Sequence, residues 1–75
     1  MTTLADWSTA PDWAQWFAID SNGYGSWYEK MPFIAVGRNG DFWAISDGGA
    51  MYGDHYLMVG QNWRELIEQR PQEAR

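Results

Sequence analysis

The sequence predicts an α+β domain: a twisted antiparallel meander of four or five strands with one C-terminal helix packed on it. Three observations support this fold class. Glycine-bearing turn signals recur at short intervals along residues 20–49, as they do where hairpins follow one another. Aromatic and β-branched residues, which favour strands, fill the segments between those turns. From residue 62 onward the apolar residues recur at helical spacing instead.

Length and composition limit the number of domains and the possible sources of stability. The 75 residues are enough for a single domain, of a size at which one hydrophobic core contributes only about 3–5 kcal/mol. The chain has no cysteine, so neither a disulfide nor a thiolate metal site can stabilise it. It does have six Trp, four Tyr and three Phe, and each buried ring removes about 150–250 Å² from water. We therefore expect most of the rings to fill the core.

The lead-in and the first hairpin come first along the chain. Residues 1–12 are expected to be loosely structured and to dock through Trp7, with either a short helical turn or an extended segment from Pro11. The meander is expected over residues 13–60, and its first strand over residues 16–20. A three-residue loop with a left-handed Gly23 is favoured after that strand.

The length of this loop sets the register of the first hairpin. A three-residue loop places Phe17 opposite Trp27, whereas a two-residue loop would place Phe17 opposite Tyr28. Because side chains alternate along a strand, the choice decides which aromatic residues share a face with Phe17. We favour the first register.

A second hairpin and a last strand complete the predicted sheet. Pro32 marks a break after the first hairpin, and residues 33–36 and 41–46 flank a second glycine-bearing turn. The expected register places Val36 opposite Phe42 and Ala35 opposite Trp43. The last strand is expected over residues 51–59, with a bulge or short loop at its glycine, Gly53.

The helix is predicted over residues 62–70. The run from Asn62 to Glu65 has a capping-box pattern, in which the Asn62 side chain can accept a hydrogen bond from an early helix N–H while the Glu65 side chain reaches back. Trp63, Leu66 and Ile67 then fall on one helix face, which we expect to lie across the sheet. Pro71 ends the helix, and residues 71–75 form a polar tail.

The charge of the chain is acidic and unevenly distributed. The net charge is −5, and residues 61–75 hold equal numbers of acidic and basic side chains, so the excess lies in residues 1–60. Such a surface repels the phosphates of nucleic acids and anionic membranes, and we expect no direct contact with nucleic acid or with membranes. The chain shows no signal peptide and no apolar run of about 20 residues. A cytoplasmic location is therefore expected.

Catalysis, cofactors and metal binding are not expected. His55 is the only histidine, and it has no cysteine or nucleophile-elbow serine to work with. The run starting at Asp20 begins like a calcium loop but has Tyr24 and Met31 where ligands are needed. Aromatic residues near acids could stack on a sugar, but filling of the core explains most of them.

Protein binding is the leading functional hypothesis, because we expect some of the thirteen aromatic residues to remain exposed outside so small a core. An acidic surface could alternatively mimic DNA at a nucleic-acid-binding site. The residues expected to contact a partner lie on the solvent face of the first hairpin and in the acidic turns, namely Asp20, Trp27, Glu29, Asp41, Asp47 and Asp54.

A pattern of aromatic, turn and charged residues runs through both ends of the chain: Trp7, Pro11, Trp13, Ala14, Trp16, Ala18, Asp20, Gly23, Trp27, Tyr28, Glu29 and Pro32, followed by Asn62, Trp63, Arg64, Arg70 and Pro71. This pattern resembles that of small uncharacterised proteins of tailed bacteriophages. The resemblance implies a phage protein in the cytoplasm of a bacterial host, where it binds and redirects a host transcription, replication or defence component. It brings no catalytic residues, and a structural or assembly role in the phage is a further alternative.

Overall fold

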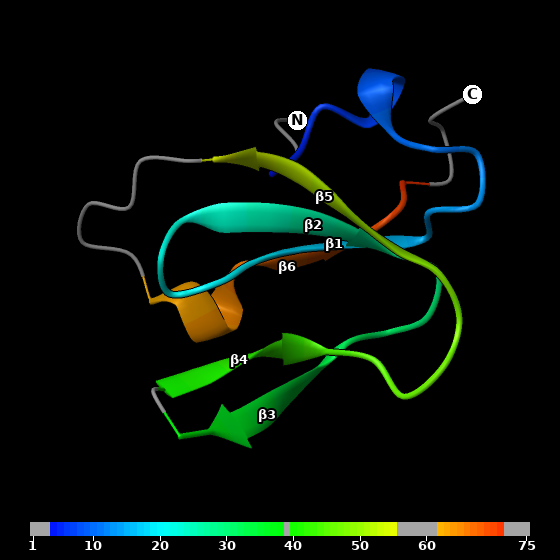
Figure 1. Cartoon of the computed structure of the whole chain (residues 1–75). Helices are drawn as coiled ribbons and strands as arrows, with labels where there is room; N and C mark the ends of the chain where they lie inside the picture. Colours follow the sequence, from blue (N-terminus) through cyan, green and yellow to red (C-terminus); the bar gives the residue numbers. More distant parts are fainter. Residues whose placement is uncertain (1–3, 39, 56–61, 72–75) are drawn as a thin grey trace.

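The computed structural model of the chain describes residues 4–38, 40–55 and 62–71, whose strands form two antiparallel sheets (Figure 1). The larger sheet has the strand order β5-β2-β1-β6, and β3 and β4 form the smaller one. The strands are β1 (Trp16–Ile19), β2 (Tyr24–Tyr28), β3 (Phe33–Gly37), β4 (Gly40–Ala44), β5 (Ala50–His55) and β6 (Ile67–Gln69). The described helices are two short 3-10 turns, η1 (Trp7–Thr9) and η2 (Trp63–Glu65). The prediction of an α+β domain is therefore wrong, and the described chain is mostly β.

The first hairpin has the register that we favoured. Phe17 lies opposite Trp27. The backbone N–H of Asp20 donates a hydrogen bond to the carbonyl oxygen of Tyr24 at 2.9 Å, which closes a three-residue loop over residues 21–23. Gly23 has a φ of +88°, a left-handed conformation that glycine adopts without a steric penalty. The side chain of Asn22 accepts a hydrogen bond from the backbone N–H of Tyr24 at 3.1 Å, as asparagine often does in turns. Local turn chemistry is therefore sufficient to pair these two strands.

The predicted helix over residues 62–70 is replaced by the single turn of η2 and by strand β6. The asparagine half of the predicted cap is present, because the side chain of Asn62 accepts a hydrogen bond from the backbone N–H of Arg64 at 3.3 Å. Leu66 then leaves helical geometry, with φ −91° and ψ 69°, and residues 67–69 pair with β1. So short a helix is marginal by itself, whereas the edge of β1 offers unpaired backbone groups. Pairing with β1 therefore prevails over the helical spacing.

The strands also do not form one meander. After β2 the chain leaves the larger sheet near Pro32, and β3 and β4 form a sheet of their own. Strand β5 then returns to pair with β2 on the side away from β1. Proline has no N–H to donate to a ladder, which favours the departure at Pro32. The predicted up-and-down order is wrong because β5, not β3, occupies the edge of β2.

The second hairpin is shifted by one residue from its predicted register. The structure pairs Gly37 with Gly40, Val36 with Asp41, Ala35 with Phe42 and Ile34 with Trp43. The expected pairs, Val36 with Phe42 and Ala35 with Trp43, are wrong because the loop contains two residues and not three. Since side chains alternate along a strand, Trp43 shares a face with Ile34, and Phe42 lies on the opposite face.

The last predicted strand, residues 51–59, is described as far as His55 and forms β5. Its remaining part lies outside the described residues. The predicted bulge is confirmed, because His55 lies opposite Tyr24 whereas Tyr52 lies opposite Ser26. Strand β5 therefore contains an extra residue at this point, as a bulged strand does.

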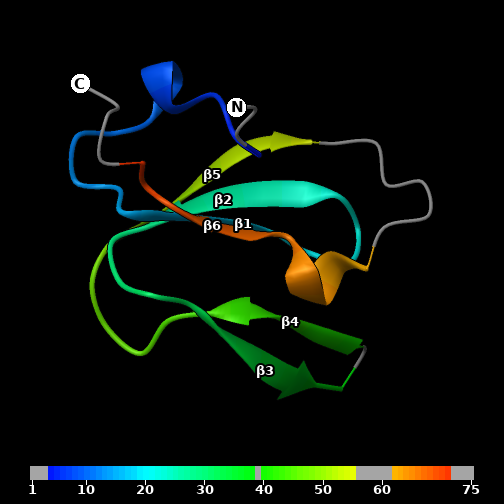
Figure 2. The same ribbon diagram turned by 180° about the vertical axis from the view of Figure 1, so that it is seen from behind.

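Aromatic residues fill the core on both faces of the larger sheet. One face carries the cluster Ala5, Trp7, Ala14, Phe17, Ile19 and Trp27. The other carries Ala18, Tyr28 and Trp43, with partly buried Trp16, Ile34, Ile45, Trp63 and Ile67. Figures 1 and 2 show the N-terminal segment on one side of the larger sheet and the β3–β4 hairpin on the other. The expectation that rings fill the core is confirmed in part: five described rings are buried, those of Trp7, Phe17, Trp27, Tyr28 and Trp43, and five others are exposed.

Glu68 on β6 holds the N-terminal segment against the sheet. Its carboxylate accepts hydrogen bonds from the indole N–H of Trp7 at 2.8 Å and from the backbone N–H groups of Leu4 at 3.0 Å and Ala5 at 3.2 Å. The side chain of Trp7 is only 7% exposed. The predicted docking through Trp7 is therefore confirmed, and its acceptor is supplied by the segment that was expected to be a helix.

Candidate functional site

The residues predicted to contact a partner lie in several parts of the molecule, and two of them, Asp20 and Asp41, line a common pocket. Trp27 is 5% exposed, and its ring lies 4.9 Å from that of Trp7 and 4.7 Å from that of Phe17, measured between centroids. Its expected place on a solvent face is wrong. The face of β2 that carries Trp27 is the one that the N-terminal segment covers.

Asp20 joins the first hairpin to the second. Its Oδ1 atom accepts a hydrogen bond from the backbone N–H of Trp43 at 2.7 Å, and the indole N–H of Trp43 donates to the carbonyl oxygen of Ile19 at 3.0 Å. Burial raises the pKa of the Asp20 carboxyl, and the hydrogen bond from Trp43 acts in the opposite direction. One oxygen of this carboxylate is therefore committed to the fold.

Glu29 and Asp41 also have partners within the chain. Oε1 of Glu29 accepts a hydrogen bond from the backbone N–H of Gly49 at 2.9 Å and so holds the turn before β5. Oδ2 of Asp41 forms an ion pair with Arg64 at 2.7 Å, which ties β4 to η2. The two other predicted acids are exposed, namely Asp47 and Asp54. The acidic side chains are thus divided between internal contacts and separate positions in solvent.

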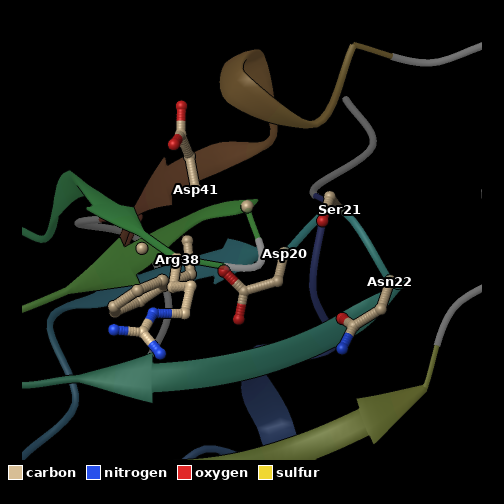
Figure 3. A pocket seen from close by; sticks show the side chains of 8 residues that line it. Asp20, Ser21, Asn22, Arg38 and Asp41 are labelled. Carbon is tan, nitrogen blue, oxygen red and sulfur yellow. The ribbon is translucent and has the colours of Figure 1, made fainter.

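An open pocket of about 370 Å³ lies between the loops of the two hairpins (Figure 3). Its lining residues are Asp20, Ser21, Asn22, Gly37, Arg38, Gly40, Asp41 and Phe42. The two loops meet because the backbone of Trp43 is bonded to Asp20. Ligand-binding pockets in proteins range from about 300 to 1,000 Å³, so this one suits a small ligand.

The outer face of the β3–β4 hairpin is uncharged and open to solvent. We call it the hairpin face, and the register assigns it Phe33, Ala35, Gly37, Gly40, Phe42 and Ala44. Phe33 is 49% exposed and Phe42 is 43% exposed. The ring of Phe42 lies over Gly37, where an added Cβ would come within 2.8 Å of the Cε1 atom of Phe42.

The hairpin face was not predicted from the sequence, because the expected register for the second hairpin was shifted by one residue from the observed one. Phe42 and Trp43 are neighbours of similar character, so only the pairing decides which of them faces the larger sheet. The available signal was the pair of glycines, Gly37 and Gly40, which can close a two-residue loop.

A smaller aromatic cluster lies on β2 and β5. The ring of Tyr24 lies 5.2 Å from that of Tyr52 and 4.6 Å from that of His55, measured between centroids. Nε2–H of His55 donates a hydrogen bond to the carbonyl oxygen of Asn22 at 3.0 Å. The histidine that we considered as an acid or base is thus engaged with the loop of the first hairpin.

The residues that carry the phage resemblance meet in the fold. Nη1 of Arg70 donates to the carbonyl oxygens of Ala14 at 2.7 Å and Pro11 at 3.2 Å. The guanidinium carbon of Arg70 also lies 5.5 Å from the centroid of the Trp7 ring, within cation–π range. These contacts between the two ends of the chain therefore hold the N-terminal segment in place.

The described residues offer no metal centre: they contain no group of three or more histidine, cysteine, aspartate or glutamate side chains placed to hold an ion. In the run that resembles a calcium loop, side-chain oxygens of Asp20 and Asn22 accept backbone hydrogen bonds instead. Within the same described part of the chain, no helix combines the length and the apolar character that crossing a bilayer requires.

The structure thus defines a small antiparallel β protein with an aromatic core, an open pocket between its hairpin loops and an exposed apolar hairpin. Comparison with protein-family models, with curated proteins and with solved structures found no match to this chain. We therefore infer its function from the surfaces and contacts described above.

Proposed function

We propose that this chain is a non-enzymatic bacteriophage protein that binds a bacterial host protein and modulates or inhibits it. The host protein is a component of transcription, replication or defence. The observation that carries the binding role is the hairpin face, with two phenylalanine rings about half exposed to water. Exposed apolar patches commonly mark interaction sites, and aromatic residues are enriched there. The phage origin rests on the resemblance at the two ends of the chain.

The rings on the hairpin face are not needed to attach the hairpin. Ile34 and Trp43, on its opposite face, already pack against the larger sheet, and Asp20 bonds to the backbone of Trp43. Exposed apolar area is unfavourable by about 25 cal/mol per Å² relative to its burial. Phe33 and Phe42 are therefore available for contact with another protein, which would cover them.

Mimicry of DNA receives less support from the geometry. A mimic presents free carboxylates to a phosphate-binding groove, but Asp20, Glu29 and Asp41 each accept a hydrogen bond or form an ion pair within the chain. Asp47 and Asp54 are exposed, which leaves few charges for such a surface.

The test is affinity capture from lysates of several bacterial species. Three immobilised proteins are compared: the wild type, a double variant with Phe33→Ser and Phe42→Ser, and the control Tyr52→Ser. Tyr52 is 56% exposed and lies on β5, away from the hairpin face. We expect the wild type and the control to retain one host protein in stoichiometric amount and the double variant to lose it. The captured protein is then assayed with and without this chain.

Two results would contradict the proposal. One is the absence of a stoichiometric host protein in every lysate, and the other is equal retention by the double variant. Salt separates the two binding modes, because contact through the hairpin face resists high salt whereas charge mimicry weakens steeply. A captured complex that dissociates at moderate salt and competes with DNA would favour mimicry.

A further inference from the structure

The pocket between the hairpin loops contains two opposite charges that do not pair with each other. Asp20 and Arg38 both line it, and within the described part of the chain neither side chain forms an ion pair. Oδ1 of Asp20 accepts the backbone N–H of Trp43, and Oδ2 has no such bond among the described residues. Arg38 is exposed and Asp20 is partly exposed, so a molecule that enters the pocket can reach both charges.

The third charged residue of the lining is already neutralised. The carboxylate of Asp41 pairs with Arg64 at 2.7 Å, and Figure 3 shows it turned away from Asp20 and Arg38. The charges left for a ligand are therefore one carboxylate and one guanidinium, beside the polar side chains of the first loop and the half-exposed ring of Phe42.

We propose that this pocket binds a small zwitterion of the α-amino acid type. Arg38 takes the carboxylate of the ligand, since a guanidinium matches a carboxylate in a bidentate arrangement. Asp20 takes the ammonium group through Oδ2, while Oδ1 keeps its bond to Trp43. The exposed ring of Phe42 contacts an apolar ligand side chain. The pocket shares Gly37, Gly40 and Phe42 with the hairpin face, and its two charged residues distinguish it from that uncharged face.

The charges of the lining select a zwitterion over a simple ion. A cation attracted by Asp20 would be repelled by Arg38, and an anion attracted by Arg38 would be repelled by Asp20. A molecule that carries both charges on neighbouring atoms satisfies the two residues together. The volume of about 370 Å³ and the wide opening admit a single amino acid.

The experiment is a titration of the ¹⁵N-labelled full chain, followed through its amide resonances. The probes are L-leucine, 3-methylbutylamine, which lacks its carboxylate, and 4-methylpentanoate, which lacks its amino group. L-leucine should cause saturable shifts at residues 20–22, 37–38 and 40–42. Each analogue should bind about tenfold more weakly or worse, because one charge-assisted hydrogen bond is lost.

Variants of the two charged residues extend the test. Arg38→Gln should weaken L-leucine binding about tenfold, and its matched control Lys30→Gln, at an exposed position outside the lining, should leave it unchanged. Asp20→Asn keeps an oxygen for the N–H of Trp43 but removes the charge, and it should weaken binding similarly. Phe33→Ser, on the hairpin face, should have no effect, which separates this site from the proposed host contact.

Three results would overturn the proposal: no saturable shift at the lining amides with L-leucine, analogues that bind as tightly as L-leucine, or unchanged affinity in Arg38→Gln. If Asp20→Asn proves unfolded by its amide spectrum, Arg38→Gln and the two analogues decide the question alone.

Discussion

The carboxylate of Asp20 lies 2.7 Å from the backbone nitrogen of Trp43 and accepts its hydrogen bond, which joins the loop of one hairpin to a strand of the other. The indole N–H of Trp43 returns a second bond to the carbonyl oxygen of Ile19. These contacts connect the two sheets. Asp20, which we expected to face a partner, therefore stabilises the packing of one hairpin against the other.

Loss of the Asp20 side chain should destabilise the protein. Asp20→Ala should lower the free energy of unfolding by about 1–3 kcal/mol, because the N–H of Trp43 loses its acceptor. Asp20→Asn should lower it less, since the amide oxygen can accept the same bond. Urea unfolding followed by tryptophan fluorescence measures both. Asp54→Asn, at an exposed position, serves as the control and should change stability by less than about 0.5 kcal/mol.

The Asp20 carboxyl should also make stability depend on pH. Burial raises its pKa from the ordinary 3.8, so the protonated form is favoured by folding. That contribution is complete below the unfolded-state pKa and is lost as pH rises through the folded-state pKa. The stability of the wild type relative to Asp20→Asn should therefore fall as the pH rises from below the ordinary pKa of 3.8 to above the raised pKa of the folded state. Urea titrations of both proteins test this, and a relative stability that rises with pH would contradict it.

Removal of Glu68 should release the N-terminal segment. Glu68→Ala leaves three N–H groups without their acceptor, and we expect a loss of about 1–3 kcal/mol in the free energy of unfolding. Amide hydrogen exchange at Leu4 and Ala5 should accelerate. Glu65→Ala, at an exposed position in η2, is the control. Unchanged exchange in Glu68→Ala would show that other contacts hold the segment.

A side chain at Gly37 should disturb the second hairpin. An added Cβ would lie 2.7 Å from the carbonyl oxygen of Gly40 and 2.8 Å from Cε1 of Phe42. Gly37→Ala should therefore cost about 1–3 kcal/mol, as overpacked sites do. The control is Gly49→Ala, whose Cβ would make an ordinary contact of 3.5 Å with Trp13; it should leave stability unchanged or raise it by up to about 1 kcal/mol. Equal midpoint temperatures of thermal unfolding for the two variants would contradict the expected clash.

Turn chemistry predicts part of this fold because it acts over a few residues. The left-handed Gly23 and the side chain of Asn22 shape the first loop, and the loop sets the pairing of β1 with β2. The cap at Asn62 is equally local. In the second hairpin, the turn was predicted correctly but its loop was predicted to be one residue too long. Because of this error, the exposed position of Phe42 on the hairpin face was not predicted.

The candidate site could be predicted only in part. Asp20 and Asp41 were identified and do line the pocket, but Arg38 and Phe42 were not. The place of Trp27 could not be predicted because both faces of its hairpin are rich in apolar residues. Its burial depends on the N-terminal segment, which Glu68 holds from the other end of the chain.

The sequence by itself determined the local turns, the first register and the use of rings as core, since each depends on near neighbours or on composition. The tertiary structure alone decided that residues 67–69 form a strand and that Trp43 faces inward while Phe42 faces outward. The physical reason is the same in both cases. A short segment with two acceptable local conformations or registers takes the one in which distant residues bond to its backbone and bury its side chains. Strand β1 provides the backbone partners for residues 67–69, and Asp20 accepts the backbone N–H of Trp43.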